Sequence, residues 1–195
     1  PFLRLFMQFL VSCFIWLNDI KITSLSFPIF NNHIQILLPT GLSLLLTILW
    51  IVGIVNALNW LDGVDGLAVG IMIIAISTFL IFVLARGDFT LFTLICAILG
   101  TTIGFLRFNS FPSSILMGDG GSYFLGFSLA AITLINPLSL STEASYNQNQ
   151  VNFIIPLIFL AVPIFDMLHV IFSRISEKKS PLYPDNRHIH HRLLK

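Results

Sequence analysis

Charged residues and cysteines are both scarce in this sequence. Charged residues make up 10% of the 195 residues and hydrophobic residues 56%, whereas soluble domains average about 25% charged residues. A water-soluble globule and a disordered chain are therefore both disfavoured, and we expect a membrane protein. The two cysteines, Cys13 and Cys96, give neither a disulfide framework nor the spacing of a zinc site. Because 10 basic residues nearly balance 9 acidic ones, no basic excess points to nucleic acid.

Long apolar runs alternate with short polar loops along the whole chain. A helix that crosses a hydrocarbon core of about 30 Å needs about 20 apolar residues. The first run is the shortest, because Arg4 interrupts it, and it also fits a buried or interfacial helix. We predict an all-α polytopic membrane protein with about six transmembrane helices in a single domain, residues 1–195. The predicted spans are Phe2–Leu17, Ile34–Val55, Leu67–Ala85, Phe89–Leu106, Gly120–Leu138 and Val151–Ile175.

The distribution of basic residues predicts the orientation in the membrane. If all six runs cross, eight of the ten basic residues lie on one face, and Lys21 and Arg86 lie on the other. Basic residues favour cytoplasmic loops, so the first face is predicted to be the cytoplasmic face of the plasma membrane. It receives residues 1–4, 56–66, 107–119 and 176–195. On the opposite face, Ile and Thr alternate with polar residues around Phe27–Pro28, which predicts a short hairpin in the first extracytoplasmic loop.

The first polar motif, Asn-Ala-Leu-Asn-Trp-Leu-Asp-Gly-Val-Asp-Gly-Leu-Ala, covers residues 56–68. Asn56, Asn59 and Asp62 are three residues apart and share one stripe if the preceding helix continues. A helix end followed by a glycine turn is the ordinary alternative. Two carboxylates, Asp62 and Asp65, are nevertheless costly to place beside apolar spans without a function.

The second motif places Asp119 among three glycines at the start of the fifth apolar run. Backbone N–H groups at a helix start favour anions there. An N-cap role and a metal-ligand role are compatible for this carboxylate, and the nearby Arg107 and Asn109 favour a functional site. No Gly-Lys-Ser/Thr follows, so this is not a P-loop.

The third motif, residues 185–192, contains three histidines between two arginines. His188, His190 and His191 suit either a transition metal or a phosphate group, and the flanking Arg187 and Arg192 favour phosphate. A solvated basic tail drawn to anionic lipid is the simpler alternative.

Two ionisable residues, Asp166 and His169, lie inside the last apolar run at i and i+3. Such a pair indicates either a functional site or a contact that only locks helix packing. A transporter or channel with an acidic path through Asp62, Asp65, Asp119 and Asp166 is therefore the main alternative function. Transport sites lie near the bilayer midplane, whereas most charges here gather at one face.

The chemistry of these motifs favours phosphate transfer at the membrane surface. Mg²⁺ is held by one or two carboxylates together with water and substrate phosphate oxygens, and Arg and His neutralise charge on a leaving oxygen. An acceptor phosphate whose second pKa is about 6 is largely dianionic at neutral pH. Positioning and metal electrostatics should then matter more than a general base.

The three motifs occur in an order that resembles the polyprenyl-phosphate N-acetylhexosamine-1-phosphate transferases, glycosyltransferase family 4. The residues that carry the resemblance are Asn-x-x-Asn-x-x-Asp-Gly-x-Asp-Gly-Leu, then Phe-Asn-x-x-Pro with Met-Gly-Asp-x-Gly-Ser, then His-x-His-His. The last form is most similar to the bacterial undecaprenyl-phosphate N-acetylglucosamine branch. The family has an Asp-Asp pair before the first span and further spans after the histidines. We therefore interpret the chain as truncated at both ends and expect it to be inactive alone.

The resemblance implies a reaction. N-acetylhexosamine-1-phosphate, here N-acetylglucosamine-1-phosphate, would pass from a UDP-sugar to undecaprenyl phosphate with release of UMP. This would begin cell-envelope polysaccharide synthesis at the cytoplasmic face, with Mg²⁺ (or Mn²⁺) as cofactor and a homodimer as an open alternative to a monomer.

The resemblance also implies roles for individual residues, with Asp119 as the magnesium ligand. Leu116 departs from the family, which has Phe there, and removes a ring that could stack on uracil; Phe108 or Phe111 could replace it. Ser113 and Ser114 replace the common Ala and basic residue. The implied catalytic residues are Asp62, Asp65, Asp119 and His188, and the implied substrate-binding residues are Asn56, Asn59, Asn109, His190, His191 and Arg192.

Overall fold

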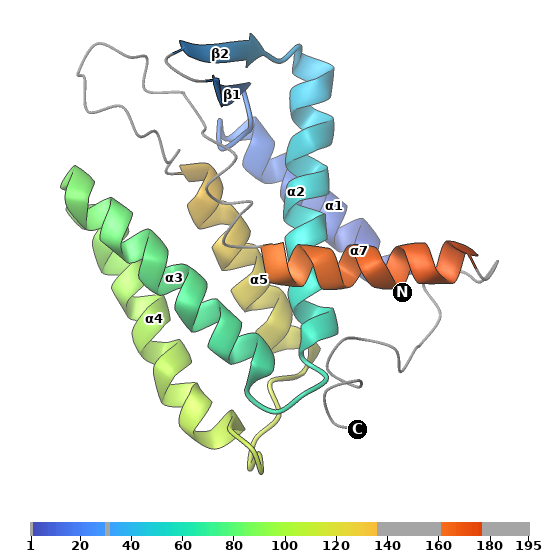
Figure 1. Cartoon of the computed structure of the whole chain (residues 1–195), viewed down its shortest axis with the longest axis vertical. Coiled ribbons are helices and arrows are strands. Elements are labelled where there is room, and N and C mark those ends of the chain that lie inside the picture. The colour runs from blue at the N-terminus through green and yellow to red at the C-terminus, as the bar shows by residue number, and fades with distance from the viewer. Residues whose placement is uncertain (1, 30–31, 136–160, 177–195) are drawn as a thin grey trace. The chain divides into compact units, whose positions relative to one another are not determined.

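The computed structural model describes residues 2–29, 32–135 and 161–176. These residues form six helices and one antiparallel pair of strands, so the predicted helical character is confirmed (Figure 1). The elements are α1 (Phe2–Leu17), β1 (Ser24–Ile29), β2 (Asn32–Leu37), α2 (Thr40–Leu61), α3 (Leu67–Arg86), α4 (Phe89–Asn109), α5 (Gly118–Ile135) and α7 (Ala161–Ser176).

Among the described residues, three helices are long and apolar enough to cross a membrane, namely α2, α3 and α4. Helix α1 is apolar but has 16 residues, and α5 has 18. The predicted run at 151–175 is described only from residue 161, where α7 begins. Membrane crossing by α1, α5 and α7 therefore stays a prediction.

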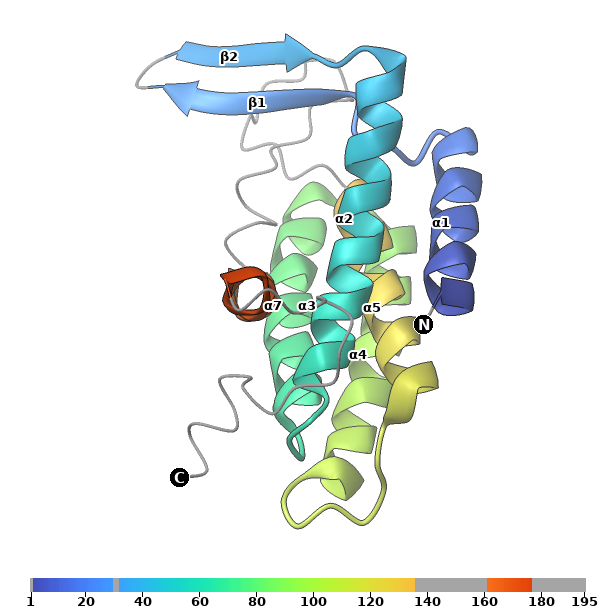
Figure 2. The ribbon, with the colours of Figure 1, turned by 90° about the vertical axis from the view of Figure 1, so that its right-hand side faces the viewer.

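The predicted bounds of the second span are wrong at both ends. Residues Ile34–Leu37 belong to β2, because they pair with β1 in the register Phe27↔Ile34 to Ser24↔Leu37. Helix α2 begins only after Pro39 and continues to Leu61. The apolar run thus combines a strand and a helix, which hydrophobicity alone does not separate. The predicted hairpin itself is present (Figure 2).

The chain divides into two compact units, and α2 and α5 each contribute to both. All contacts between site residues reported below lie within the second unit. The first unit contains residues 1–53 and 130–161, and the second contains residues 54–129 and 162–195.

Polar side chains join the helices of the first unit. The indole N–H of Trp16 donates to Ser43 Oγ at 3.1 Å, which links α1 to α2. The indole N–H of Trp50 donates to Thr133 Oγ1 at 2.8 Å, which links α2 to α5. Ser43 and Thr133 are buried, so these bonds pair hydroxyls that lie inside the protein.

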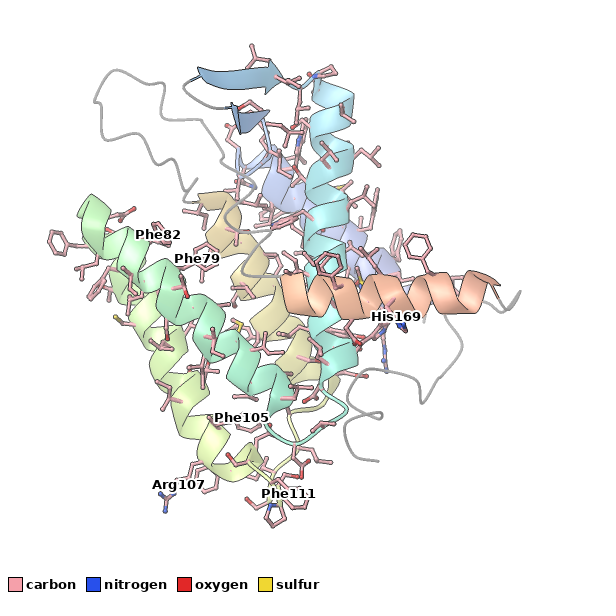
Figure 3. The ribbon with its side chains drawn as sticks, in the orientation of Figure 1. Phe79, Phe82, Phe105, Arg107, Phe111 and His169 are labelled. Carbon is pink, nitrogen blue, oxygen red and sulfur yellow. The ribbon has the colours of Figure 1, made fainter. Side chains whose placement is uncertain are left out.

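In the second unit, α3 and α4 pack side by side (Figure 1). The buried side chains of α3 recur every three or four residues, as expected for one packed face; Phe79 is among them (Figure 3). The opposite face of α3 exposes large apolar side chains, including Ile74 and Ile81. An apolar face of this kind suits a lipid environment and agrees with a membrane protein. The buried set of α3 is Ala68, Val69, Met72, Ala75, Ile76, Phe79 and Val83.

Candidate active site

The last turn of α2 meets the first turn of α5 through Asn59. Its side-chain Nδ2 donates to Asp119 Oδ1 at 3.0 Å and to Ser122 Oγ at 2.8 Å. The Ser122 hydroxyl, which is buried, donates to the backbone oxygen of Asp119 at 3.1 Å. The first and second motifs therefore converge, although Asn59 and Asp119 are 60 positions apart.

Asp62 follows directly after α2 and lies beside the start of α5. Burial is the main cause that raises the pKa of its carboxyl from 3.8 to about 6. The backbone N–H of Gly118 donates to this carboxylate and partly offsets the rise, while the negative charges of Asp119 and Asp65 increase it. Three carboxylates are thus close enough to repel one another, which creates a strongly negative local field.

Asp65 and Asn109 make a different set of contacts, between two loops. Asn109, which is 2% exposed, accepts the N–H of Gly66 at 3.0 Å through Oδ1 and donates to the Ile115 carbonyl at 3.0 Å through Nδ2. Asp65 Oδ2 accepts the N–H of Ser113 at 3.0 Å. We call these contacts the loop clamp, because they fix the α2–α3 turn to the α4–α5 loop.

The loop clamp depends on the backbone conformation of Gly66. This residue has φ +75°, in the left-handed region that favours glycine. That conformation directs its N–H toward Asn109, and α3 begins at the next residue. Replacement by a residue with a side chain would strain the turn.

Other residues that the sequence singled out lie on the elements around this cluster. Asn56 is on α2, three residues before Asn59, and is partly buried. Arg107 is exposed in the last turn of α4 (Figure 3). Phe111 is 85% exposed and Leu116 is 76% exposed on the α4–α5 loop. The histidine-loop residues, His188, His190, His191 and Arg192, lie outside the described residues.

The residues present fit an open Mg²⁺ site rather than a closed one. Within the described ranges, no three His, Cys, Asp or Glu side chains form a metal-ligating group. Mg²⁺ does not need such a group, because water and substrate phosphates complete its shell. Burial, and then the charges of Asp119 and Asp65, raise the pKa of Asp62, and a divalent cation beside Asp119 would stabilise these negative charges.

An apolar pocket of about 230 Å³ lies between α4 and α5. At 100° per residue, its α5 residues occupy the side of that helix opposite to Asp119 and Ser122. The hydroxyls of Thr101 and Thr102 donate to the backbone carbonyl of Ile98, within their own helix. The lining thus suits hydrocarbon better than a polar ligand. It consists of Thr101, Thr102, Phe105, Met117, Gly121, Phe124 and Leu125.

The predicted Asp166 and His169 pair on α7 is divided by burial. Asp166 is 1% exposed, whereas His169 is exposed (Figure 3). The two side chains are therefore not buried together as a pair on α7.

Two residues of the α2–α5 contact were not predicted as site residues, Ser122 and Gly126, although Ser122 ends the Met-Gly-Asp-x-Gly-Ser motif. Both share one stripe with Asp119, at i+3 and i+7, so helical spacing was the signal available. Gly126 allows close helix packing: a Cβ there would lie 2.8 Å from the Cα of Val55.

Comparison with known proteins identifies the family. The model of glycosyl transferase family 4 matches residues 1–136, and the chain belongs to this family, as the motifs predicted.

Similar proteins carry related names. The chain is 38% identical over 149 residues to a probable undecaprenyl-phosphate N-acetylglucosaminyl 1-phosphate transferase of Bacillus subtilis, covering 76% of this chain and 40% of that protein. It is 43% identical over 91 residues to the phospho-N-acetylmuramoyl-pentapeptide-transferase of Limosilactobacillus fermentum, covering 47% and 28%. It is 36% identical over 102 residues to the decaprenyl-phosphate N-acetylglucosaminephosphotransferase of Mycobacterium leprae, covering 49% and 25%. The matched regions thus span between a quarter and two fifths of these relatives.

Proposed function

We propose that the intact protein transfers N-acetylglucosamine-1-phosphate from UDP-N-acetylglucosamine to a polyprenyl phosphate, here undecaprenyl phosphate. An oxygen of the acceptor phosphate forms a bond to the sugar-bearing phosphorus of the donor. The bond from that phosphorus to the bridging oxygen breaks, and UMP leaves. The observation that carries the proposal is the convergence of Asn59, Asp62 and Asp119 at the meeting ends of two apolar helices. The names of the relatives support it.

The membrane placement supports a lipid acceptor. Helices α2, α3 and α4 satisfy the length and composition of membrane spans. We propose six spans in this chain, with the site on the cytoplasmic face of the plasma membrane, where a soluble UDP-sugar and a lipid phosphate can meet. A homodimer through the spans remains part of the proposal. The product would be the first lipid-linked intermediate of a cell-envelope polysaccharide.

Asp119, with Asp62 beside it, would hold Mg²⁺; Mn²⁺ has similar ligand preferences. The ion would supply neutralisation of the negative charge on the donor diphosphate. Asn59 fixes the Asp119 carboxylate through the 3.0 Å hydrogen bond. One oxygen of Asp119 is thereby engaged, and the orientation of the carboxylate is set before any substrate arrives.

The remaining residues position the substrates. The loop clamp of Asp65 and Asn109 holds the loops on either side of the carboxylates. We propose that His188, His190, His191 and Arg192 bind the donor phosphates or sugar. Because the acceptor phosphate is largely dianionic at neutral pH, it attacks without a strong general base.

A metal-dependent UMP assay tests this function. The intact protein in membranes, given UDP-N-acetylglucosamine, undecaprenyl phosphate and Mg²⁺, should release UMP, and Asp119→Asn should lower the rate by about 100-fold or more. Asp88→Asn is the matched control: Asp88 caps α4 by accepting the N–H of Leu91 at 3.0 Å, and Asn is an equally good cap. Metal-independent release, or equal loss in both variants, would contradict the proposal.

A further inference from the structure

Contacts between α2 and α5 continue for several turns beyond the carboxylates. Val55 faces Gly126, Asn59 faces Ser122 and Asp119, and Asp62 faces Gly118. Residue numbers rise along α2 as they fall along α5, so the two helices run in opposite directions where they meet. We call this line of contacts the α2–α5 seam. The chemistry-bearing residues occupy one end of it, and Gly126 lies seven residues after Asp119 along α5.

At Gly126 the backbones of the two helices come close together. A Cβ at this position would lie 2.8 Å from the Cα of Val55 and 3.4 Å from the carbonyl oxygen of Ile54. Both are backbone atoms and cannot rotate away, unlike a side chain. Alanine would therefore force one helix to move until the 2.8 Å contact reaches the ordinary range, which starts at 3.4 Å.

Gly126 differs in this respect from Gly70, Gly100, Gly104 and Gly121, which also lie in helices. A Cβ at Gly70, Gly100 or Gly104 would have no atom within 4 Å. At Gly121 the near atom is Cγ of Met117, which belongs to a flexible side chain. At Gly126, unlike at these four glycines, an added methyl group meets the backbone of another helix.

A helix displacement at Gly126 would also affect the contacts of Asn59, which are about one helical turn away along the seam. Asn59 is four residues after Val55 on α2, and Ser122 is four residues before Gly126 on α5. The Asn59 amide spans the seam at 2.8 Å to Ser122 and 3.0 Å to Asp119. A separation of a few tenths of an ångström lengthens both bonds, and hydrogen bonds beyond about 3.5 Å no longer count as such.

We propose that Gly126 is a positioning residue of the active site. Its missing side chain sets the α2–α5 spacing at which Asn59 orients the Asp119 carboxylate. The kinetic part of this inference rests on the proposed transferase function; the geometric part does not. Gly126 acts through Val55 and Asn59 and touches no substrate.

Thiol cross-linking in the intact protein measures the geometry directly. With Cys13 and Cys96 changed to Ser, an Asn59→Cys, Ser122→Cys pair is treated with bifunctional thiol reagents of graded length. With glycine at 126, the shortest reagents should cross-link best. Adding Gly126→Ala should move the optimum to a longer reagent. Gly100→Ala is the control, because it adds the same methyl group in open space, and it should leave the optimum unchanged.

Activity then separates positioning from stability. Gly126→Ala should lower kcat by about 10- to 100-fold, the scale of a misplacement near 1 Å, while Gly100→Ala changes it less than twofold. Asn59→Gln lengthens the side chain by one methylene group, so its amide can extend across a wider gap. Combined with Gly126→Ala, it should lose less activity than the product of the two single losses.

Each result has a defined meaning. An unchanged cross-linking optimum in Gly126→Ala would overturn the proposal. Failure of the shortest reagents to bridge the glycine-containing pair would also overturn it, even if Gly126→Ala does not fold. A shifted optimum in a protein that transfers no sugar phosphate would support the seam geometry and contradict the proposed function instead.

Discussion

Asn59 donates its side-chain amide hydrogen to Asp119 over 3.0 Å, and this bond joins the end of α2 to the beginning of α5. Asp119 lies where the backbone N–H groups and dipole of α5 stabilise a negative charge. An amide is suited to face it, because Asn59 supplies a donor without adding charge. Burial raises the pKa of the nearby Asp62, and the charges of Asp119 and Asp65 add to that rise.

Replacing Asn59 tests the importance of this donor. Asn59→Asp places a second negative charge against Asp119, so we expect loss of activity and a lower thermal midpoint in detergent at pH 7. Asn59→Ala removes two hydrogen bonds and should cost roughly 1–3 kcal/mol. Asn18→Ala, which removes an exposed side-chain bond to the Phe14 carbonyl, is the control. Full activity in Asn59→Asp would contradict the described geometry.

The raised pKa of Asp62 predicts a pH dependence of stability. The folded carboxyl titrates near 6 and the unfolded one near 3.8, so between these values the folded state binds more protons. Stability therefore falls as pH rises through this window, and the penalty is complete above pH 6. Asp62→Asn should raise the thermal midpoint above pH 6 and have little effect near pH 4. A difference from the wild type that does not vary with pH would refute this.

The loop clamp predicts different outcomes at Asp65 for amide and alanine substitutions. Asp65→Asn keeps an oxygen that accepts the Ser113 N–H, so it should preserve the thermal midpoint and reduce activity less than 10-fold if positioning is the main role. Asp65→Ala removes the acceptor and should cost about 1–3 kcal/mol. Thermal unfolding and UMP release measure the two effects. If Asp65→Asn is as inactive as Asp119→Asn, its charge acts directly.

Asn109, the last residue of α4, should be among the positions most sensitive to substitution. Asn109→Asp keeps the acceptor for Gly66 but loses the donor to Ile115, which leaves a carboxylate beside a carbonyl in a buried position. We expect a loss of roughly 2–4 kcal/mol and reduced activity. Ser114→Ala removes an exposed bond to the Phe108 carbonyl and is the control. Equal midpoints for the two variants would contradict the clamp.

Cysteine labelling tests the membrane placement. In a protein without Cys13 and Cys96, Phe111→Cys should react with a membrane-impermeant thiol reagent added from the cytoplasmic side. Ile74→Cys, on the exposed apolar face of α3, should not react from either side, because lipid covers it. Labelling of residue 74 in intact membranes would contradict a span at α3.

The bounds of α3 and α4 were nearly predictable because local signals mark them. Gly66 precedes α3, and Gly87 and Asp88 separate it from α4. The start of α2 was not predictable, because Ile34–Leu37 continues its apolar run and only pairing with β1 makes this segment a strand.

The motifs predicted which residues would gather but not what they would contact. The bond from Gly66 to Asn109 crosses 43 positions, and sequence alone cannot show that Asn109 uses both ends of its amide within the protein. Likewise, Gly126 lies in an apolar run without polar neighbours. Its closeness to Val55 follows only from how α2 and α5 pack.

The most direct test follows the sugar-bearing phosphorus itself. Intact protein in membranes is given undecaprenyl phosphate, Mg²⁺ and UDP-N-acetylglucosamine labelled with ³²P on that phosphorus. We predict that the label moves into the lipid fraction as UMP is released, and that Asp119→Asn prevents this while Asp88→Asn does not. Label that stays in solution as UDP or free phosphate, or transfer that persists without Asp119, would contradict the account.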